Sequence, residues 1–231
     1  MPTVATGFET LTHGFPFPNW FPPGSPVVVV PTPFGRLTVG DANAGLCGGM
    51  VFAALDFYLC GMPRPSEPTA PVIRYFCRRL LDSWHFPFGV MKYYDGQRRS
   101  SASRYLAGVK VLDGLTYKTI HEEWPKIRDA LDAGMPAALG LVNSASFDPR
   151  RLVKNHQVLA HGYTIAGEAV TIHVYDPNYP NDHTAELSFS LADPNGAGLV
   201  QHSCQGATVR GIFLTDYARP EAAPRFSVSC V

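Results

Sequence analysis

The segment Gly-Leu-Cys-Gly-Gly contains the residue with the clearest chemical potential in the chain, Cys47. An apolar run over 50–59 follows and predicts a buried helix, so Cys47 is expected in its first turn. There the helix dipole and the free backbone N–H groups favour a thiolate. Gly48 and Gly49 are poor helix formers, and we interpret them as leaving room for a substrate carbonyl, with Gly48 a candidate oxyanion position. A single cysteine is more often a small buried hydrophobe, so the prediction depends on its partners.

A thiolate nucleophile needs a histidine that exchanges its proton and a third group that holds the imidazole. His156 begins a predicted strand over 156–165, and Asp176 ends the next one. A turn around Gly167 makes the two a hairpin, and antiparallel pairing places the start of the first strand beside the end of the second. We therefore predict that Cys47 is the nucleophile, His156 the general base and Asp176 the orienting carboxylate.

The other histidines are weaker candidates for the base. His161 and His173 lie at odd offsets from His156 and Asp176, so each is expected on the opposite face of its strand. Three further histidines carry no spacing signal: His121, His183 and His202. No metal-ligand spacing and no phosphate-binding loop is present, so no metal and no cofactor are predicted.

The elements that must position these residues divide the chain into three parts. An arm over 1–33, rich in proline and aromatic residues, is expected to pack extended on the body, with a short strand at 27–30. The part over 34–134 is mainly helical and the part over 135–231 mainly β, which predicts one α+β domain. Helices are expected over 47–60, 72–84 and 121–134, the last capped by Thr116 or Thr119 and ended by Gly134. Strands are expected over 136–142, 156–165, 169–176, 184–190 and 208–215.

The stretch 86–108 is not assigned to an element. Within it, residues 92–99 combine two tyrosines with two arginines. This stretch is interpreted as a solvated loop, with recognition of a substrate carboxylate or phosphate as the alternative.

Composition limits the classes of partner. Nineteen Lys and Arg balance nineteen Asp and Glu, so no electrostatic attraction to nucleic acid or an anionic membrane is expected. No apolar run reaches the ~18 to 20 residues of a membrane span, and the first residues lack a secretory signal, so a cytoplasmic protein is expected. Five cysteines without a CxxC spacing suggest no disulfide framework, although pairing of Cys204 with Cys230 stays open.

Four blocks in order resemble bacterial papain-like cysteine peptidases, most of all the C39-like group, named for the peptidase domains of bacteriocin-processing transporters. They are Cys-Gly at a helix start, Leu-Asp-Ala-Gly-Met-Pro-Ala-Ala-Leu-Gly-Leu, His-x-Val-Leu-x-x-Gly-Tyr and Val-x-Ile-x-Val-Tyr-Asp-Pro-Asn, between Cys47 and Asn178. The resemblance implies a papain-like fold, with the cysteine on a central helix packed against a mostly antiparallel sheet. It also implies the triad Cys47, His156 and Asp176.

The chain departs from that family at the oxyanion donor. The family places a glutamine about six residues before the cysteine, whereas this chain has Asp41 there, and Asn43 is the nearest amide. Either Asn43 supplies the donor, or both residues only shape the turn before the helix.

The predicted reaction is hydrolysis of a peptide or other amide bond through a thioester acyl-enzyme. Two alternatives remain: a transglutaminase-like or other acyltransferase with the same triad, and a catalytically silent papain-fold binding protein. The substrate, the oligomeric state and whether the arm occludes the cleft are left open.

Overall fold

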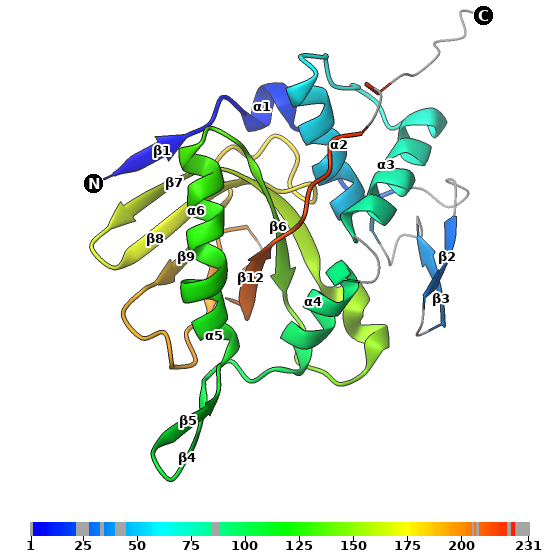
Figure 1. Cartoon of the computed structure of the whole chain (residues 1–231). Coiled ribbons are helices and arrows are strands. Elements are labelled where there is room, and N and C mark those ends of the chain that lie inside the picture. The colour runs from blue at the N-terminus through cyan, green and yellow to red at the C-terminus, as the bar shows by residue number, and fades with distance from the viewer. Residues whose placement is uncertain are drawn as a thin grey trace, which may run out of the picture.

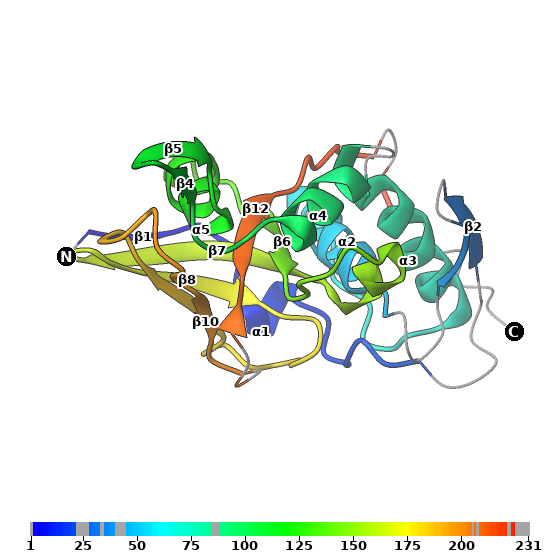
Figure 2. The ribbon, with the colours of Figure 1, turned by 90° about the horizontal axis from the view of Figure 1, so that it is seen from below.

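The chain is described here by a computed structural model that defines residues 2–21, 28–32, 35–39, 45–84, 88–204, 206, 208–220 and 223–224. It is an α+β protein in which an antiparallel sheet lies beside a group of helices (Figures 1 and 2). The helical segments are α1 (Thr10–His13), α2 (Cys47–Leu59), α3 (Ala70–Ser83), α4 (Phe88–Arg98), α5 (Leu115–Tyr117), a π-helix (Lys118–Glu123), α6 (Trp124–Asp132) and a 3-10 helix (Pro149–Lys154). The strands are β1 (Thr3–Ala5), β2 (Val28–Thr32), β3 (Gly35–Val39), β4 (Arg104–Leu106), β5 (Val109–Leu112), β6 (Ala137–Val142), β7 (His156–Ala166), β8 (Ala169–Tyr175), β9 (Glu186–Ser190), β10 (Val200–His202), β11 (Thr208–Val209) and β12 (Gly211–Leu214).

The main sheet has the strand order β11-β10-β9-β8-β7-β6-β12, and its pairs are antiparallel. The long strand β7 is shared, because its first half pairs with β6 and its second half with β1. The predicted hairpin of β7 and β8 is confirmed, and Gly167 turns it with a φ of 63°. The helix α6 covers one face of this sheet (Figure 1).

Helix α2 is buried along most of its length between the sheet and α3, as the apolar run predicts. A Cβ atom on Gly49 would collide with the backbone carbonyl oxygen of Phe76 in α3. A Cβ atom on Gly48 would lie 2.6 Å from the Ser83 hydroxyl and 2.8 Å from the Gln157 amide. The two glycines therefore let α3 and β7 approach the start of α2. This close packing gives a structural reason for glycines in a helical turn, and the predicted space for a substrate carbonyl stays a prediction.

Replacement of Gly49 by alanine is expected to destabilise the protein. Alanine favours helix by about 1 kcal/mol over glycine, but forcing a methyl group into a packed contact costs about 1–3 kcal/mol. Because the obstacle is backbone, which cannot rotate away, the second effect should win. Urea denaturation should show a lower midpoint at an unchanged slope. A midpoint equal to or above that of the wild type would contradict this account of the α2–α3 contact.

The helix expected over 121–134 begins earlier than predicted. Residues 115–132 are helical throughout, with a π-helical stretch in the middle, so Thr116 and Thr119 lie inside the helix and do not cap it. Their hydroxyls instead bind the strand region: Thr116 donates to the Gly198 carbonyl at 2.8 Å, and Thr119 accepts the Ile212 N–H at 3.2 Å. Gly134 ends the helix with a φ of 77°, as predicted.

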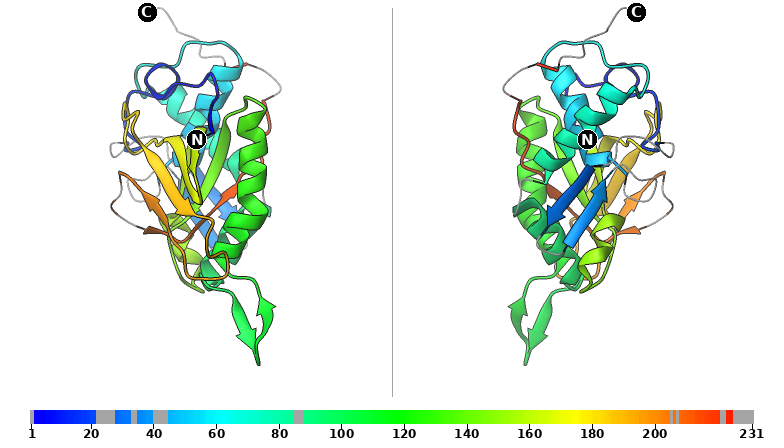
Figure 3. Two further views of the ribbon diagram at one scale, coloured as in Figure 1. Left: turned by 90° about the vertical axis from the view of Figure 1, so that its left-hand side faces the viewer. Right: turned by 90° about the vertical axis from the view of Figure 1, so that its right-hand side faces the viewer.

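Residues 92–98 belong to α4 and Arg99 directly follows it, so the interpretation of this stretch as a loop is wrong. Both arginines have partners in or near this helix. Arg99 forms an ion pair with Asp95 at 2.9 Å, and the Arg98 guanidinium lies over the Tyr94 ring. After α4 the chain forms the hairpin β4–β5, which projects from the body (Figures 1 and 3).

The N-terminal arm packs on the body, and it contains β1 and α1 in addition to extended chain. Its phenylalanines are buried, and the ring of Phe15 lies 4.8 Å from that of Phe76 in α3, whereas Trp20 is 59% exposed. No helix among the described segments is both long and apolar enough to cross a membrane.

A buried ion pair joins α2, α3 and the C-terminal segment. Asp56 is completely buried and contacts Arg79 through two guanidinium nitrogens at 2.7 and 3.0 Å. The hydroxyls of Tyr75 and Tyr217 donate to the same carboxylate at 2.7 and 2.6 Å. Burial of an ion pair is tolerated when further hydrogen bonds satisfy its atoms, as they do here.

Candidate active site

The structure brings the three residues of the predicted triad together. Cys47 is the first residue of α2 and is half-buried, whereas His156 opens β7 and Asp176 directly follows β8. The Nε2 atom of His156 lies 2.7 Å from Oδ1 of Asp176. The Cys47 side chain lies next to the His156 ring, close enough to raise its pKa. Because Asp176 occupies Nε2, the nitrogen left for the sulfur is Nδ1.

Strand pairing explains why the histidine and the aspartate meet. Leu159 of β7 lies opposite Tyr175 of β8, so the residue after Tyr175 reaches the start of β7. The helix start is held against the same end of β7 by the close contact between Gly48 and Gln157. The nucleophile, the base and the acid therefore come from three elements that converge at one end of the sheet.

Neighbouring groups shift the pKa values of His156 and Asp176 so that both side chains are charged at neutral pH. Burial alone would lower the pKa of His156, but the neighbouring Asp176 and Cys47 raise it to about 10. Burial would raise the pKa of Asp176, yet hydrogen bonds from His156, His202 and the Asn178 backbone hold it well below its ordinary value. At neutral pH the site therefore contains a carboxylate and an imidazolium, and an imidazolium beside a cysteine favours the thiolate.

The sequence interpretation missed a second histidine on the same carboxylate. Nε2 of His202 lies 2.9 Å from Oδ2 of Asp176, and both side chains are fully buried. His202 ends β10, a short strand that the sequence did not predict. No local spacing links position 202 to position 176, so only the three-dimensional pairing of the strands reveals the contact.

Asn19 was also missed, and it connects the nucleophile to the aspartate. Its Oδ1 accepts the backbone N–H of Leu46, the residue before Cys47, at 2.6 Å. Its Nδ2 donates to Oδ1 of Asn178 at 3.1 Å, and its backbone N–H donates to the Pro177 carbonyl at 2.8 Å. The N-terminal arm thus ties the turn before α2 to the turn after β8.

Tyr93 of α4 forms part of the wall beside the triad. Its hydroxyl donates to the His156 carbonyl at 3.2 Å. Burial and the nearby Cys47 raise the pKa of Tyr93 well above its ordinary value, so the hydroxyl keeps its proton. It is therefore a neutral donor next to the reacting atoms.

The candidate oxyanion residues Asp41 and Asn43 lie outside the described residues. Gly48 lies in the first turn of α2, where backbone N–H groups have no carbonyl partner within the helix. Those amides are the donors that the described part of the site offers to a developing oxyanion.

The other predicted histidines lie apart from Cys47. His161 packs near Phe8 and Thr10, and burial lowers its pKa to about 4. His173 forms an ion pair with Glu186 at 3.1 Å. Within the described residues, no group of three or more His, Cys, Asp or Glu side chains is arranged to hold a metal ion.

Cysteines 47, 60, 77 and 204 are free thiols. Pairing of Cys204 with Cys230 involves a residue outside the described part of the chain.

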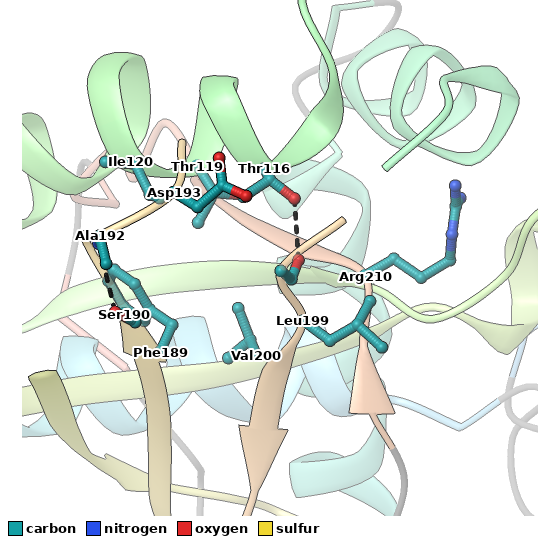
Figure 4. Close-up of a pocket in the computed structure, with 11 residues that line it drawn as sticks. Thr116, Thr119, Ile120, Phe189, Ser190, Ala192, Asp193, Leu199, Val200 and Arg210 are labelled. Carbon is teal, nitrogen blue, oxygen red and sulfur yellow. Dashed lines mark hydrogen bonds between the residues drawn. The ribbon is translucent and has the colours of Figure 1, made fainter. Parts of the chain in front are cut away.

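A separate cavity of about 190 Å³ contains none of the triad residues (Figure 4). It lies between the π-helical stretch and β9–β10, and its lining is mostly apolar, including Ile120, Phe189 and Val200. Arg210 contributes the aliphatic part of its side chain, while its guanidinium turns away to the carbonyls of Arg99 and Ser144 at 2.6 and 3.1 Å.

The fold and the site together define an α+β protein with a Cys-His-Asp constellation at the start of a buried helix. No known family model, no curated protein and no solved structure matches the chain. Its function is therefore inferred from the geometry of the site and from the chemistry of its residues.

Proposed function

We propose that the chain is a papain-like cysteine hydrolase that cleaves a peptide or other amide bond. The observation that carries the proposal is the convergence of three side chains: His156 is hydrogen-bonded to Asp176 and lies next to Cys47. A nucleophile bonded to a base that a third group orients is the recurring arrangement of covalent acyl transfer. The resemblance of four sequence blocks to papain-like peptidases supports the same reading, because it assigns these residues the same roles.

The proposed reaction has two steps. The Cys47 thiolate attacks the carbonyl carbon, and the developing oxyanion lies near the first-turn amides of α2. His156 then donates its Nδ1 proton to the leaving nitrogen, the C–N bond breaks, and a thioester remains on Cys47. In the second step His156 takes a proton from water, the hydroxide attacks the thioester, and the acid and the free thiol are released.

A mixture of synthetic peptides, analysed by mass spectrometry, tests the proposal. Hydrolysis would produce pairs of fragments whose summed mass exceeds the parent peptide by one water. Transfer to an amine would instead join two components, which would identify the acyltransferase alternative. Pretreatment with iodoacetamide should stop either reaction by alkylating Cys47. Intact peptides after prolonged incubation would favour the silent binding protein.

The pH dependence of hydrolysis should reveal the charged histidine. Because the pKa of His156 is raised from an ordinary 6.5 to about 10, its imidazolium persists through neutral pH. Acylation needs that proton, so kcat/KM should stay high at pH 8 and fall as the pH rises through about 10. Asp176→Asn removes the charge that raises the pKa, and the fall should then begin at lower pH. A fall near pH 6.5 in the wild type would contradict the assigned charge state.

A further inference from the structure

His202 occupies a fully enclosed position next to the proposed triad. It ends β10, is 3% exposed and lies opposite Leu187 of β9. The ring of Tyr179, from the turn after β8, lies 6.3 Å from its own ring. A histidine buried this deeply must have its ring nitrogens partnered, since an unpaired buried polar group is costly.

The partners of the two ring nitrogens determine where the proton lies. Nδ1 accepts the backbone N–H of Cys204 at 3.2 Å, so Nδ1 carries no proton. The proton of the ring is therefore on Nε2, which faces Oδ2 of Asp176 at 2.9 Å. The 2.9 Å approach is an ion-pair contact and not an aligned hydrogen bond, and both Nε2 and Oδ2 are buried without a hydrogen-bond partner among the described residues.

Three titratable groups face His202. They are Asp176 from the end of β8, Tyr179 from the turn that follows, and Cys204, whose thiol lies 3.3 Å from Asp182. A neutral ring places the partial positive charge of its Nε2–H near Oδ2 without supplying a second full positive charge. The carboxylate then remains a full counter-charge for His156, which occupies Oδ1.

We propose that neutral His202 is a positioning residue of the candidate active site: its Nε2–H holds Asp176 in the orientation that stabilises the charged form of His156. This inference rests on the proposed function, because it assigns His202 a role in forming the thiolate–imidazolium pair. His202 touches neither the substrate nor the sulfur and acts through Asp176 alone. Asn178 assists from the other side, since its backbone N–H donates to Oδ1 at 2.8 Å.

Two substitutions separate positioning from simple packing. His202→Phe keeps a ring of similar size but has no donor for Oδ2, whereas His202→Gln keeps an N–H donor at nearly the same distance from the backbone. The probe is iodoacetamide, and the measurement is the rate of alkylation at Cys47 between pH 4 and 9, followed by peptide mass mapping. This readout reports thiolate formation directly and needs no substrate.

We expect His202→Phe to move the acid limb of the alkylation profile upward by about one pH unit, so that alkylation slows about tenfold at any pH on that limb. His202→Gln should retain a profile close to that of the wild type. His173→Phe is the matched control, because His173 pairs with Glu186 and does not contact Asp176. Superimposable profiles for the wild type and folded His202→Phe would overturn the inference.

Nuclear magnetic resonance of the wild type gives a second test that does not depend on the folding of a variant. The ring nitrogens of His202 should show the neutral Nε2–H form at pH 7, and a proton on Nδ1 would overturn the inference.

The alkylation experiment distinguishes failure of the proposed function from failure of the role of His202. If Cys47 of the wild type is not alkylated selectively at pH 6, the proposed function fails and this role falls with it. If Cys47 of the wild type is alkylated selectively but His202→Phe leaves the alkylation profile unchanged, only the proposed role of His202 fails.

Discussion

Replacement of Cys47 by alanine is expected to reduce peptide hydrolysis to the background rate, a loss of at least about 10⁴-fold. The reason is that Cys47 supplies the only atom in the proposed mechanism that bonds to the substrate. His156 and Asp176 would remain hydrogen-bonded to each other, but an ordered base without a nucleophile leaves little rate enhancement. The measurement is the initial rate of fragment formation on a peptide that the wild type cleaves. Undiminished turnover would reject the assignment of the nucleophile.

Cys60 provides the matched control for this substitution. It lies directly after the last residue of the same helix and is also a half-buried free thiol. It lies a helix length away from His156, so Cys60→Ala should leave the rate unchanged within a factor of about two. If both variants lose activity equally, the effect comes from the stability of α2 and not from the chemistry of Cys47.

Replacement of Arg79 by methionine is expected to cause the largest loss of stability, about 3–5 kcal/mol in the free energy of unfolding. The arginine neutralises Asp56, which is completely buried. Without it, the carboxylate keeps only the hydroxyls of Tyr75 and Tyr217 as partners among its side-chain contacts. Methionine restores much of the volume but none of the charge, so the cost is an uncompensated buried ion. Urea denaturation measures it directly.

Two further variants identify the origin of that loss. Lys92→Met removes an ion pair with Asp216 whose side chains are 38% and 52% exposed, and it should cost less than about 1 kcal/mol. The double variant Asp56→Asn with Arg79→Met removes both charges, and it should recover part of the stability that Arg79→Met loses. If the double variant is as unstable as the sum of the two single variants, the buried charge is not the cause.

The β7–β8 hairpin could be predicted from the sequence because its signals are local. A glycine turn between two β-rich runs fixes the pairing, and the pairing places His156 beside Asp176. Cys47 could be predicted in the same way, since an apolar run and a preceding glycine-rich segment define the start of α2.

Other contributors to the site could not be found in this way because their contacts join distant parts of the chain. Asn19 and Asn178 are 159 residues apart, and neither position carries a local pattern that indicates the other. His202 belongs to a three-residue strand whose existence depends on pairing with β9. The packing role of Gly49 could not be predicted for a related reason: the collision that excludes a side chain involves Phe76 of the next helix.

Because the site is assembled from distant segments of the chain, it can form only after the last of them has been synthesised. A ribosome releases Cys47 more than one hundred residues before His156, and His202 emerges later still. Until those residues arrive, the cysteine lacks its proposed base and the counter-charge, so it behaves as an ordinary thiol. Under the proposed function, reactivity is thus withheld from the growing chain and appears only when the arm, the helix and the last strands have packed together.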